Sequence, residues 1–200
     1  MELVKFNIKN IKYALPKADG EYETPVAYGF ARSMALESDT STKTIFGDGV
    51  KIAVIVNDKG KKGSMTTNVV STDYEIAMGR KMKLESGIAD IKQTKSIEHA
   101  LYFETEALMS DGSIKTAKTW LFNVISSRPS ESFDQTEDDI NESSFETPIE
   151  VKGIKVKYKD GDDYRDTDGN EVFAWKTTVT NEDDAFETFG DQVVLPIVGV

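Results

Sequence analysis

The chain has 200 residues, contains no cysteine and carries a formal net charge of −11 at pH 7. This length is enough for one domain with a substantial core, and the lack of cysteine excludes disulfides, thiolate zinc sites and thiol nucleophiles. The N-terminus mixes charged and apolar residues, which is unlike a signal peptide, and no apolar run approaches the ~20 residues of a membrane-spanning helix. We therefore expect one domain over residues 1–200, made in the cytoplasm and without a membrane partner.

The negative charge is concentrated toward the C-terminus. Residues 131–200 hold 19 acidic and 6 basic residues, whereas residues 1–130 hold 16 acidic and 18 basic residues. An acidic surface repels phosphate, so ordinary nucleic-acid binding is disfavoured. The alternative is that the acidic residues serve only to keep the protein in solution.

Alternation of apolar and polar residues, broken by turn signals, predicts a mainly β chain. One hairpin is predicted over residues 97–124, with its turn at residues 110–113. Its first strand has two faces, one with Ile97, Leu101, Phe103 and Ala107 and the other with Glu98, Glu104 and Glu106; its second strand has one face with Trp120, Phe122 and Val124.

A second hairpin is predicted from residues 151–158 and 173–179, with a β-bulge at Gly153, where the apolar parity changes. Further strands are expected over residues 5–13, 28–37, 42–46, 51–56 and 63–70. Two short helices are expected as well. Thr72 and Glu75 form a capping box for a helix over residues 73–78, and Asn181 precedes an acidic first turn over residues 182–189.

These elements predict a β-sandwich of two antiparallel sheets with one or two short flanking helices. The polar segment 126–147 is expected to be an acidic surface loop within the same domain. Open sandwiches expose strand edges that recruit other chains unless they are covered. The N-terminal residues 1–13 and the apolar C-terminus are therefore candidate docking arms, the alternative being edge strands of the chain's own sandwich.

The sequence contains no clear motif for catalysis, nucleotide binding or metal binding. The only histidine, His99, shares a predicted strand face with Leu101 and Phe103, so we expect a core side chain. Serine-hydrolase, Walker and dinucleotide motifs are absent. The segment 160–169 resembles a calcium loop, but Tyr164 and Trp175 stand where two ligands are required. We therefore expect no enzyme activity, no catalytic residue, no metal site and no cofactor.

Two stretches resemble the major tail proteins of long, non-contractile-tailed phages that infect Gram-positive hosts. The opening KFNIKNIKYA, residues 5–14, is similar to the lysine-aromatic strand that starts these proteins. Residues 128–132 and Thr136, which follow the aromatic strand 120–124, resemble the family's Arg-Pro-Ser loop. Gly63, which opens a predicted strand, and the short capped helix that ends at Gly79 also resemble features of this family.

The resemblance covers about residues 3–157. In place of the family's Ala-Asp-Asn turn, this chain has Phe-Gly-Asp-Gly at residues 46–49, and the last 40 residues match less clearly. No appended immunoglobulin-like module is seen.

The resemblance implies a tail-tube fold that assembles into stacked hexameric rings, through which DNA passes without specific binding. The protein would then be a virion component in the phage tail, and its partners would be other copies, the tape measure protein and the tail terminator. The matched arm is residues 5–13 and the candidate long loop is residues 38–49. These give the candidate contact residues Lys5, Phe6, Ile8, Ile11, Tyr13, Thr42, Phe46 and Asp48.

The resemblance also suggests a role for the acidic residues. Carboxylates that line the lumen would repel passing phosphates, and Glu98, Glu104 and Glu106 are the candidates. One alternative is a non-catalytic β-sandwich module, such as an adhesin, that binds carbohydrate through exposed aromatic residues. The other is a glycosidase, which requires a pair of carboxylates, and the sequence singles out no pair.

Overall fold

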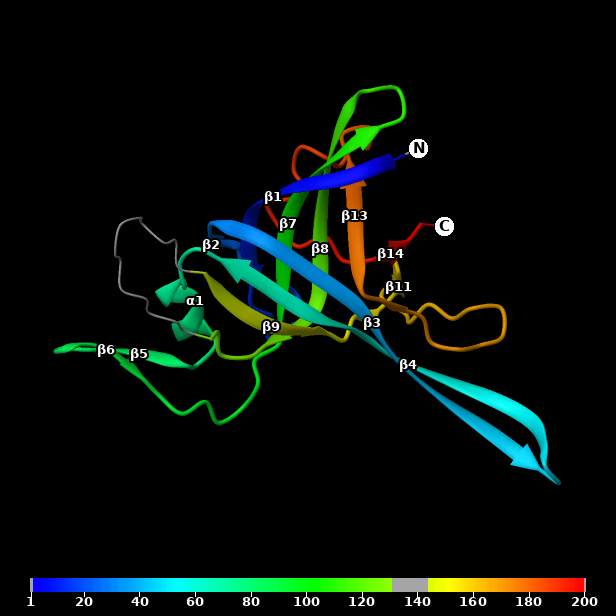
Figure 1. The fold of residues 1–200 in the computed structure, drawn as a ribbon. Coiled ribbons are helices and arrows are strands. Elements are labelled where there is room, and N and C mark those ends of the chain that lie inside the picture. The colour runs from blue at the N-terminus through cyan, green and yellow to red at the C-terminus, as the bar shows by residue number, and fades with distance from the viewer. Residues whose placement is uncertain (1, 131–143, 200) are drawn as a thin grey trace, which may run out of the picture.

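A computed structural model describes residues 2–130 and 144–199, and shows a mainly β fold with one short helix (Figure 1). Its elements are β1 Glu2–Ala14, β2 Val26–Gly29, β3 Ala31–Gly47, β4 Val50–Thr67, α1 Thr72–Ala77, β5 Lys81–Leu84, β6 Gly87–Asp90, β7 His99–Met109, β8 Ile114–Ser126, β9 Phe145–Val151, β10 Ile154–Lys155, β11 Lys157–Tyr158, β12 Phe173–Ala174, β13 Lys176–Thr180 and β14 Ile197–Val198.

Most strands belong to one antiparallel sheet, in the order β2-β1-β7-β8-β9-β4-β3, with β13 paired to β8. Three two-stranded sheets are attached to it: β5 with β6, β10 with β12, and β11 with β14, the last being parallel. The predicted hairpin of residues 97–124 is confirmed as β7 and β8, which pair from His99 to Leu108.

Strand β8 has one edge that two partners share. Residues 117–121 pair with β13, whereas residues 124–126 pair with β9. Asn123 lies between these two regions with a φ of 48°, and the ladder to β7 shifts register there, as expected of a bulge. The bulge reverses the side-chain alternation, so Val124 packs with Leu121, whereas Trp120 and Phe122 lie on the opposite face. The prediction that Trp120, Phe122 and Val124 share a face was therefore wrong.

The sheet curls, because its two end strands must lie near each other in space. β2 and β3 occupy opposite ends of the strand order, yet only Phe30 separates them in sequence. The main core lies on the inner face of this curl. Its fully buried residues are Ile11, Tyr13, Tyr28, Met65, Tyr74, Met78, Leu101, Leu121, Val124, Ile149 and Val151.

A second apolar cluster lies on the outer face of β7 and β8. The segment that follows β13 covers it: Phe189 packs there with Tyr102 and Trp120, and the Trp120 indole donates to the Phe189 carbonyl at 2.8 Å. This segment is a series of turns, so the helix expected over residues 182–189 was wrong. The carboxylate of Asp183 accepts from the Thr180 amide, and Lys118 donates to the Phe186 carbonyl, so both groups favour short turns over a continuous helix.

The first predicted helix is confirmed. α1 begins after Ser71, whose hydroxyl accepts from the amide of Tyr74 at 3.3 Å, so Ser71 and not Thr72 is the N-cap. The helix ends before Gly79, which has a φ of 68° and is well suited to this left-handed conformation.

The strands expected between residues 28 and 70 merge into a longer hairpin. β3 and β4 pair from Ala31 and Thr67 to the turn after Gly47. Residues 38–49, the candidate long loop, are therefore mainly strand, and the turn is confined to Asp48 and Gly49, both with positive φ.

The second predicted hairpin is confirmed only at β10 and β12. β9 ends at Val151, Gly153 takes a φ of 73°, and β13 pairs with β8 instead. The chain therefore turns at Gly153, where a bulge was predicted. Of the predicted loop 126–147, Ser126 belongs to β8 and residues 145–147 to β9, while residues 131–143 lie outside the described residues.

Gly63 gives a test of the β3 and β4 pairing. A Cβ atom at this position would lie 1.8 Å from the carbonyl oxygen of Ala35, which is backbone and cannot move without disturbing the ladder. We expect Gly63→Ala to lower the free energy of unfolding by about 1–3 kcal/mol, measured by urea denaturation. Gly199→Ala is the control, because nothing lies within 4 Å of the added atom. Equal stabilities of the two variants would contradict the observed backbone approach.

Candidate interaction surfaces

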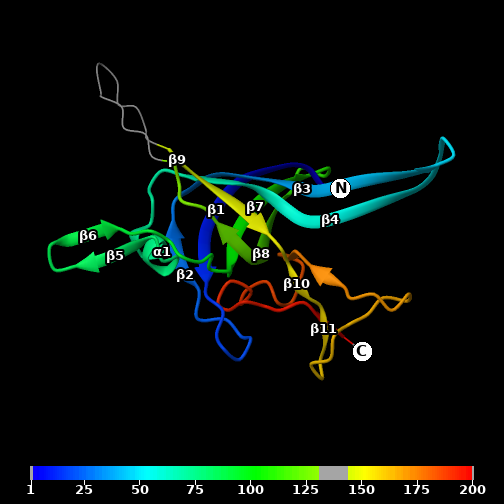
Figure 2. The same ribbon diagram turned by 90° about the horizontal axis from the view of Figure 1, so that it is seen from below.

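The far half of the β3 and β4 hairpin projects from the rest of the fold (Figures 1 and 2). We call residues 40–59 the distal hairpin. Except for the half-buried Gly47, all of these residues are exposed. Seven large apolar side chains are among them: Ile45, Phe46, Val50, Ile52, Val54, Ile55 and Val56.

Apolar side chains occupy both faces of the distal hairpin. Thr42 pairs with Val56 and Thr44 with Val54 on one face, whereas Ile45 pairs with Ala53 on the other. A water-facing ribbon would carry polar residues on at least one face. An isolated two-stranded hairpin is also only marginally stable in water. A projection of this kind is therefore a candidate surface for a partner.

Three edge strands of the large sheet are also available for pairing. In the described part of the chain, β2 pairs with β1 alone, β3 with β4 alone and β13 with β8 alone. Each strand therefore presents one row of backbone amides and carbonyls without a neighbouring strand. Such edges can accept a strand from another chain.

The N-terminal contact candidates divide into two groups. Ile11 and Tyr13 are buried in the chain's own core and pair with β2, so their side chains are not on the surface. Lys5, Phe6 and Ile8 line a groove of about 390 Å³ between β1 and β3. The whole of β1 belongs to the large sheet through its pairing with β7.

The hairpin candidates lie at the surface. Thr42 and Phe46 are in the exposed part of β3, and Phe46 is 66% exposed. Asp48 is in the turn at the tip, with a φ of 51°. These three residues therefore lie on the distal hairpin, whereas Lys5 and Phe6 lie on β1.

Glu104 and Glu106 lie on β7, on the side opposite Leu101 and Phe103, as predicted, and both carboxylates are well paired. Glu104 accepts from Tyr102 and Asn10, and Glu106 accepts from Lys9 at 2.6 Å and from Asn7. The hydrogen bond from Lys9 holds the pKa of Glu106 below its usual value. Glu98 is exposed and precedes β7, so the three residues do not form one strand stripe.

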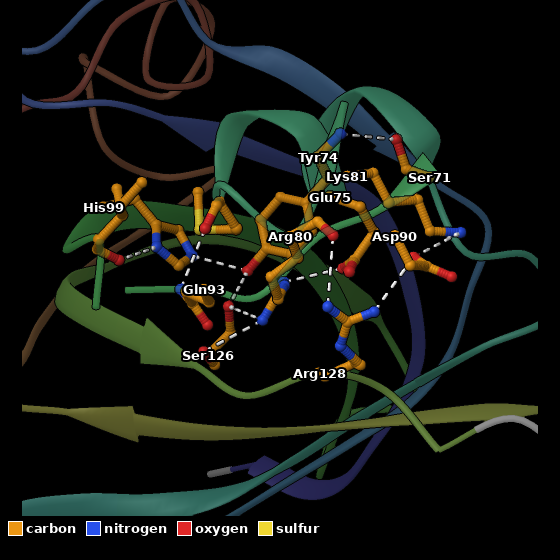
Figure 3. Close-up of polar contacts among 12 residues, drawn as sticks. Ser71, Tyr74, Glu75, Arg80, Lys81, Asp90, Gln93, His99, Ser126 and Arg128 are labelled. Atoms are coloured by element: carbon orange, nitrogen blue, oxygen red, sulfur yellow. Dashed lines mark hydrogen bonds and ion pairs between the residues drawn. The ribbon is translucent and has the colours of Figure 1, made fainter. Parts of the chain in front are cut away.

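A buried polar network surrounds α1 (Figure 3). Arg80 and Glu75 form an ion pair of 2.8 Å with side chains that are 0% and 1% exposed. Arg80 also donates to the carbonyl oxygen and hydroxyl of Ser126. The Tyr74 hydroxyl lies 2.8 Å from Ser126 Oγ and 2.9 Å from His99 Nε2.

The prediction that His99 is a core side chain is confirmed. It is 0% exposed and packs edge-on against Tyr74 at a centroid distance of 5.4 Å. Burial lowers the pKa of His99 to about 4, and burial raises the pKa of Glu75 despite the opposing effect of Arg80. The network therefore joins α1 to β7 and β8.

Arg128 extends the network to the surface and holds the β5 and β6 hairpin. Its guanidinium donates to the carbonyls of Ile91, at 2.8 Å, and Arg80, and to the Asp90 carboxylate at 3.1 Å. The Arg-Pro-Ser segment noted in the sequence thus begins with the residue that attaches this hairpin. The hairpin itself was not predicted, because its strands are only four residues long.

Several carboxylates of the acidic segment 160–171 have local partners. The Asp166 carboxylate accepts from the amides of Asp168 and Asn170, and Lys155 bridges Asp163 and Glu171 at 2.9 and 2.7 Å. Within the described residues no group of three or more His, Cys, Asp or Glu side chains is arranged to hold a metal ion.

Neither tryptophan is among the exposed side chains. Trp120 is 0% exposed, and Trp175 is half-buried against the main core.

No family model matches this chain, and no curated protein matches it. Among the residues that the structure describes, no helix is both long and apolar enough to cross a membrane.

His99 predicts a pH dependence of stability. Its folded-state pKa, about 4, lies below the ordinary value of 6.5, so between these pH values the unfolded chain binds a proton that the folded chain does not. Stability is therefore lost as the pH falls from about 6.5 to about 4, by up to about 3 kcal/mol. Urea unfolding at several pH values measures this slope.

The variant His99→Phe is the comparison. It removes the titrating group and leaves the Tyr74 hydroxyl with one partner fewer, so we expect lower stability at pH 7 and no loss from this group at lower pH. An unchanged slope in the variant would assign the pH dependence to other groups.

Arg128→Lys tests the attachment of the β5 and β6 hairpin. Lysine cannot reproduce the forked donor geometry that reaches two carbonyls and a carboxylate. We expect faster amide hydrogen exchange over residues 81–91 with little change in the exchange of β7 and β8. Arg165→Lys, whose guanidinium donates to Gly169 in an exposed turn, should leave residues 81–91 unchanged.

Proposed function

We propose that this chain is a structural subunit of a phage tail tube, in which hexameric rings stack to form a conduit for DNA. The observation that carries the proposal is the distal hairpin, which is apolar on both faces and projects from the fold. A subunit that acts alone would have no use for such a surface. A subunit in a stack can cover it with the next copy.

The resemblance at residues 5–14 and 128–132 supports the same function. In the tail-tube family a long loop contacts the next ring, and residues 38–49 of this chain lie within the projecting hairpin. The curled sheet, with its main core on the inner face and α1 beside it, is compatible with the two-layered sandwich of that family. The tape measure protein and tail terminator are the other partners that this role requires.

The open edges of β3 and β13 support lateral association. In the tube family the inner sheets of neighbouring subunits join into one barrel, and an edge strand without a neighbour is the requirement for such joining. Two such edges in one subunit allow a ring, because each copy can offer one edge to each neighbour.

The lumen requires a face that does not bind DNA. Glu104 and Glu106 remain candidates, although the Lys9 ammonium offsets the charge of Glu106 and the segment after β13 covers part of the same face. The outer face of β3, β4 and β9 is a second candidate. Small side chains and three carboxylates occupy it: Ser33, Ala35, Glu37, Lys62, Ser64, Thr66, Glu146, Pro148 and Glu150.

Electron microscopy of the purified protein at high concentration tests the function. We expect rings or tubes about 100 Å wide, on the order of several packed sheet layers. Replacing residues 42–56 by an Asn-Gly turn between Ser41 and Asn57, which are paired, should abolish tubes and leave the subunit folded, because the removed side chains are exposed.

Phe173→Ser is the control, since Phe173 is 45% exposed and lies outside the hairpin. It should assemble as the unaltered protein does. A chain that stays monomeric at all concentrations and is missing from intact virions would refute the proposed function, and tubes formed by the shortened variant would refute the role of the hairpin.

A further inference from the structure

A second group of exposed apolar side chains lies around α1 and the β5 and β6 hairpin. We call it the α1 end, and its members are Val69, Ile76, Met82, Leu84 and Ile88, which are 37% to 56% exposed. The described residues contain seventeen exposed large apolar side chains, and twelve of them belong either to the distal hairpin or to the α1 end. Exposed apolar surface is therefore concentrated in two places.

These two places are at opposite ends of the molecule. In Figures 1 and 2 the β5 and β6 hairpin projects on one side and the distal hairpin on the other. When two identical copies pair such unlike surfaces, one copy keeps its distal hairpin free and the other keeps its α1 end free. Association of this type repeats from copy to copy and builds an open stack.

We propose that the α1 end is the surface on which the distal hairpin of a second copy of this chain docks. This inference rests on the proposed function and names the partner surface that a stacked tube requires. The occupant is a second copy because the chain itself carries a complementary apolar projection at its other end.

The charges at the two hairpin turns are complementary as well. The distal hairpin carries Asp48 and Lys51 at its tip, and the β5 and β6 hairpin carries Lys83 and Glu85. Among the described ion pairs none involves any of these four side chains. Each acidic turn residue can therefore meet a lysine of the other copy, which fixes register, while the apolar contacts supply most of the affinity.

The α1 end is held rigid in the single chain, which favours docking. The Asp90 carboxylate lies 3.1 Å from Arg128 and 3.9 Å from Lys81, and Gln93 donates to the Met78 carbonyl at 3.0 Å. A two-stranded hairpin without such attachment would lose conformational freedom on binding, and its prior order removes that cost.

Two one-sided variants test the proposal. The first carries F46S, I52S and V56T and lacks the apolar distal hairpin; the second carries M82Q, L84Q and I88T and lacks the apolar α1 end. Circular dichroism and thermal unfolding establish that both are folded. In sedimentation velocity neither should stack. An equimolar mixture should form a finite complex, because the intact α1 end of the first accepts the intact hairpin of the second.

The control is Ile114→Thr, which removes an apolar side chain that is 58% exposed and outside both surfaces. It should assemble as the unaltered chain does, and loss of stacking in it would overturn the proposal in favour of general apolar aggregation. Stacking by the second variant alone, or a mixture that does not associate while the unaltered chain stacks, would place the docking surface elsewhere, for example in the groove between β1 and β3.

The charge pair gives an independent measurement. Asp48→Lys and Lys83→Glu should each raise the protein concentration needed for stacking several-fold, and the double variant should restore it. Additive loss in the double variant would overturn the proposed register. If the unaltered chain does not stack at all, the proposed function fails and this inference fails with it. If the unaltered chain stacks but the two one-sided variants do not associate when mixed, only this inference fails.

Discussion

The fold depends on the bulge in β8 at Asn123. This one residue allows β8 to pair with β13 along its first half and with β9 along its second half. A straight strand would keep a single partner on that edge and would place all its even-numbered side chains on one face. Because the alternation reverses, Leu121 and Val124 both enter the main core, while Trp120 and Phe122 enter the second cluster. The same strand thereby serves two cores on opposite faces of the sheet.

The curl of the sheet has a consequence for the surface. β9 and β13 pair with different parts of β8, and β4 pairs with β9 and β3 with β4. The hairpin of β3 and β4 continues past the core as the distal hairpin. Its paired backbone satisfies the hydrogen bonds of a projecting ribbon, and its apolar side chains are exposed in the single chain. The α1 end is fixed on the other side by buried polar groups, chiefly the Glu75 and Arg80 pair. Breaking such a buried pair is costly, so this end keeps its shape.

Some of the acidic side chains in the C-terminal third have local partners that the sequence does not reveal. Several carboxylates of the C-terminal third, such as Asp163, Asp166 and Asp183, bind lysine or backbone amides locally. Local pairing of this kind shapes turns, as the absence of a helix after β13 illustrates. A lumen hypothesis must therefore consider which carboxylates lack a cationic partner. On the outer face of β3, β4 and β9, Glu37 lies 3.8 Å from Lys62, whereas none of the described ion pairs involves Glu146 or Glu150.

The sequence by itself determined the β character, the β7 and β8 hairpin and the buried position of His99, because alternation is a local signal. It also placed a short helix, predicted over residues 73–78 and observed over residues 72–77, although the N-cap is Ser71 and not Thr72. The tertiary structure decided where β13 pairs, that Ile11 and Tyr13 are core residues, and that residues 38–49 are strand. Those outcomes depend on partners far along the chain, such as the pairing of Lys176 with Leu121. The apolar run at residues 52–56 was visible in the sequence, but a buried strand and an exposed hairpin give the same pattern, and only the surrounding fold distinguishes them.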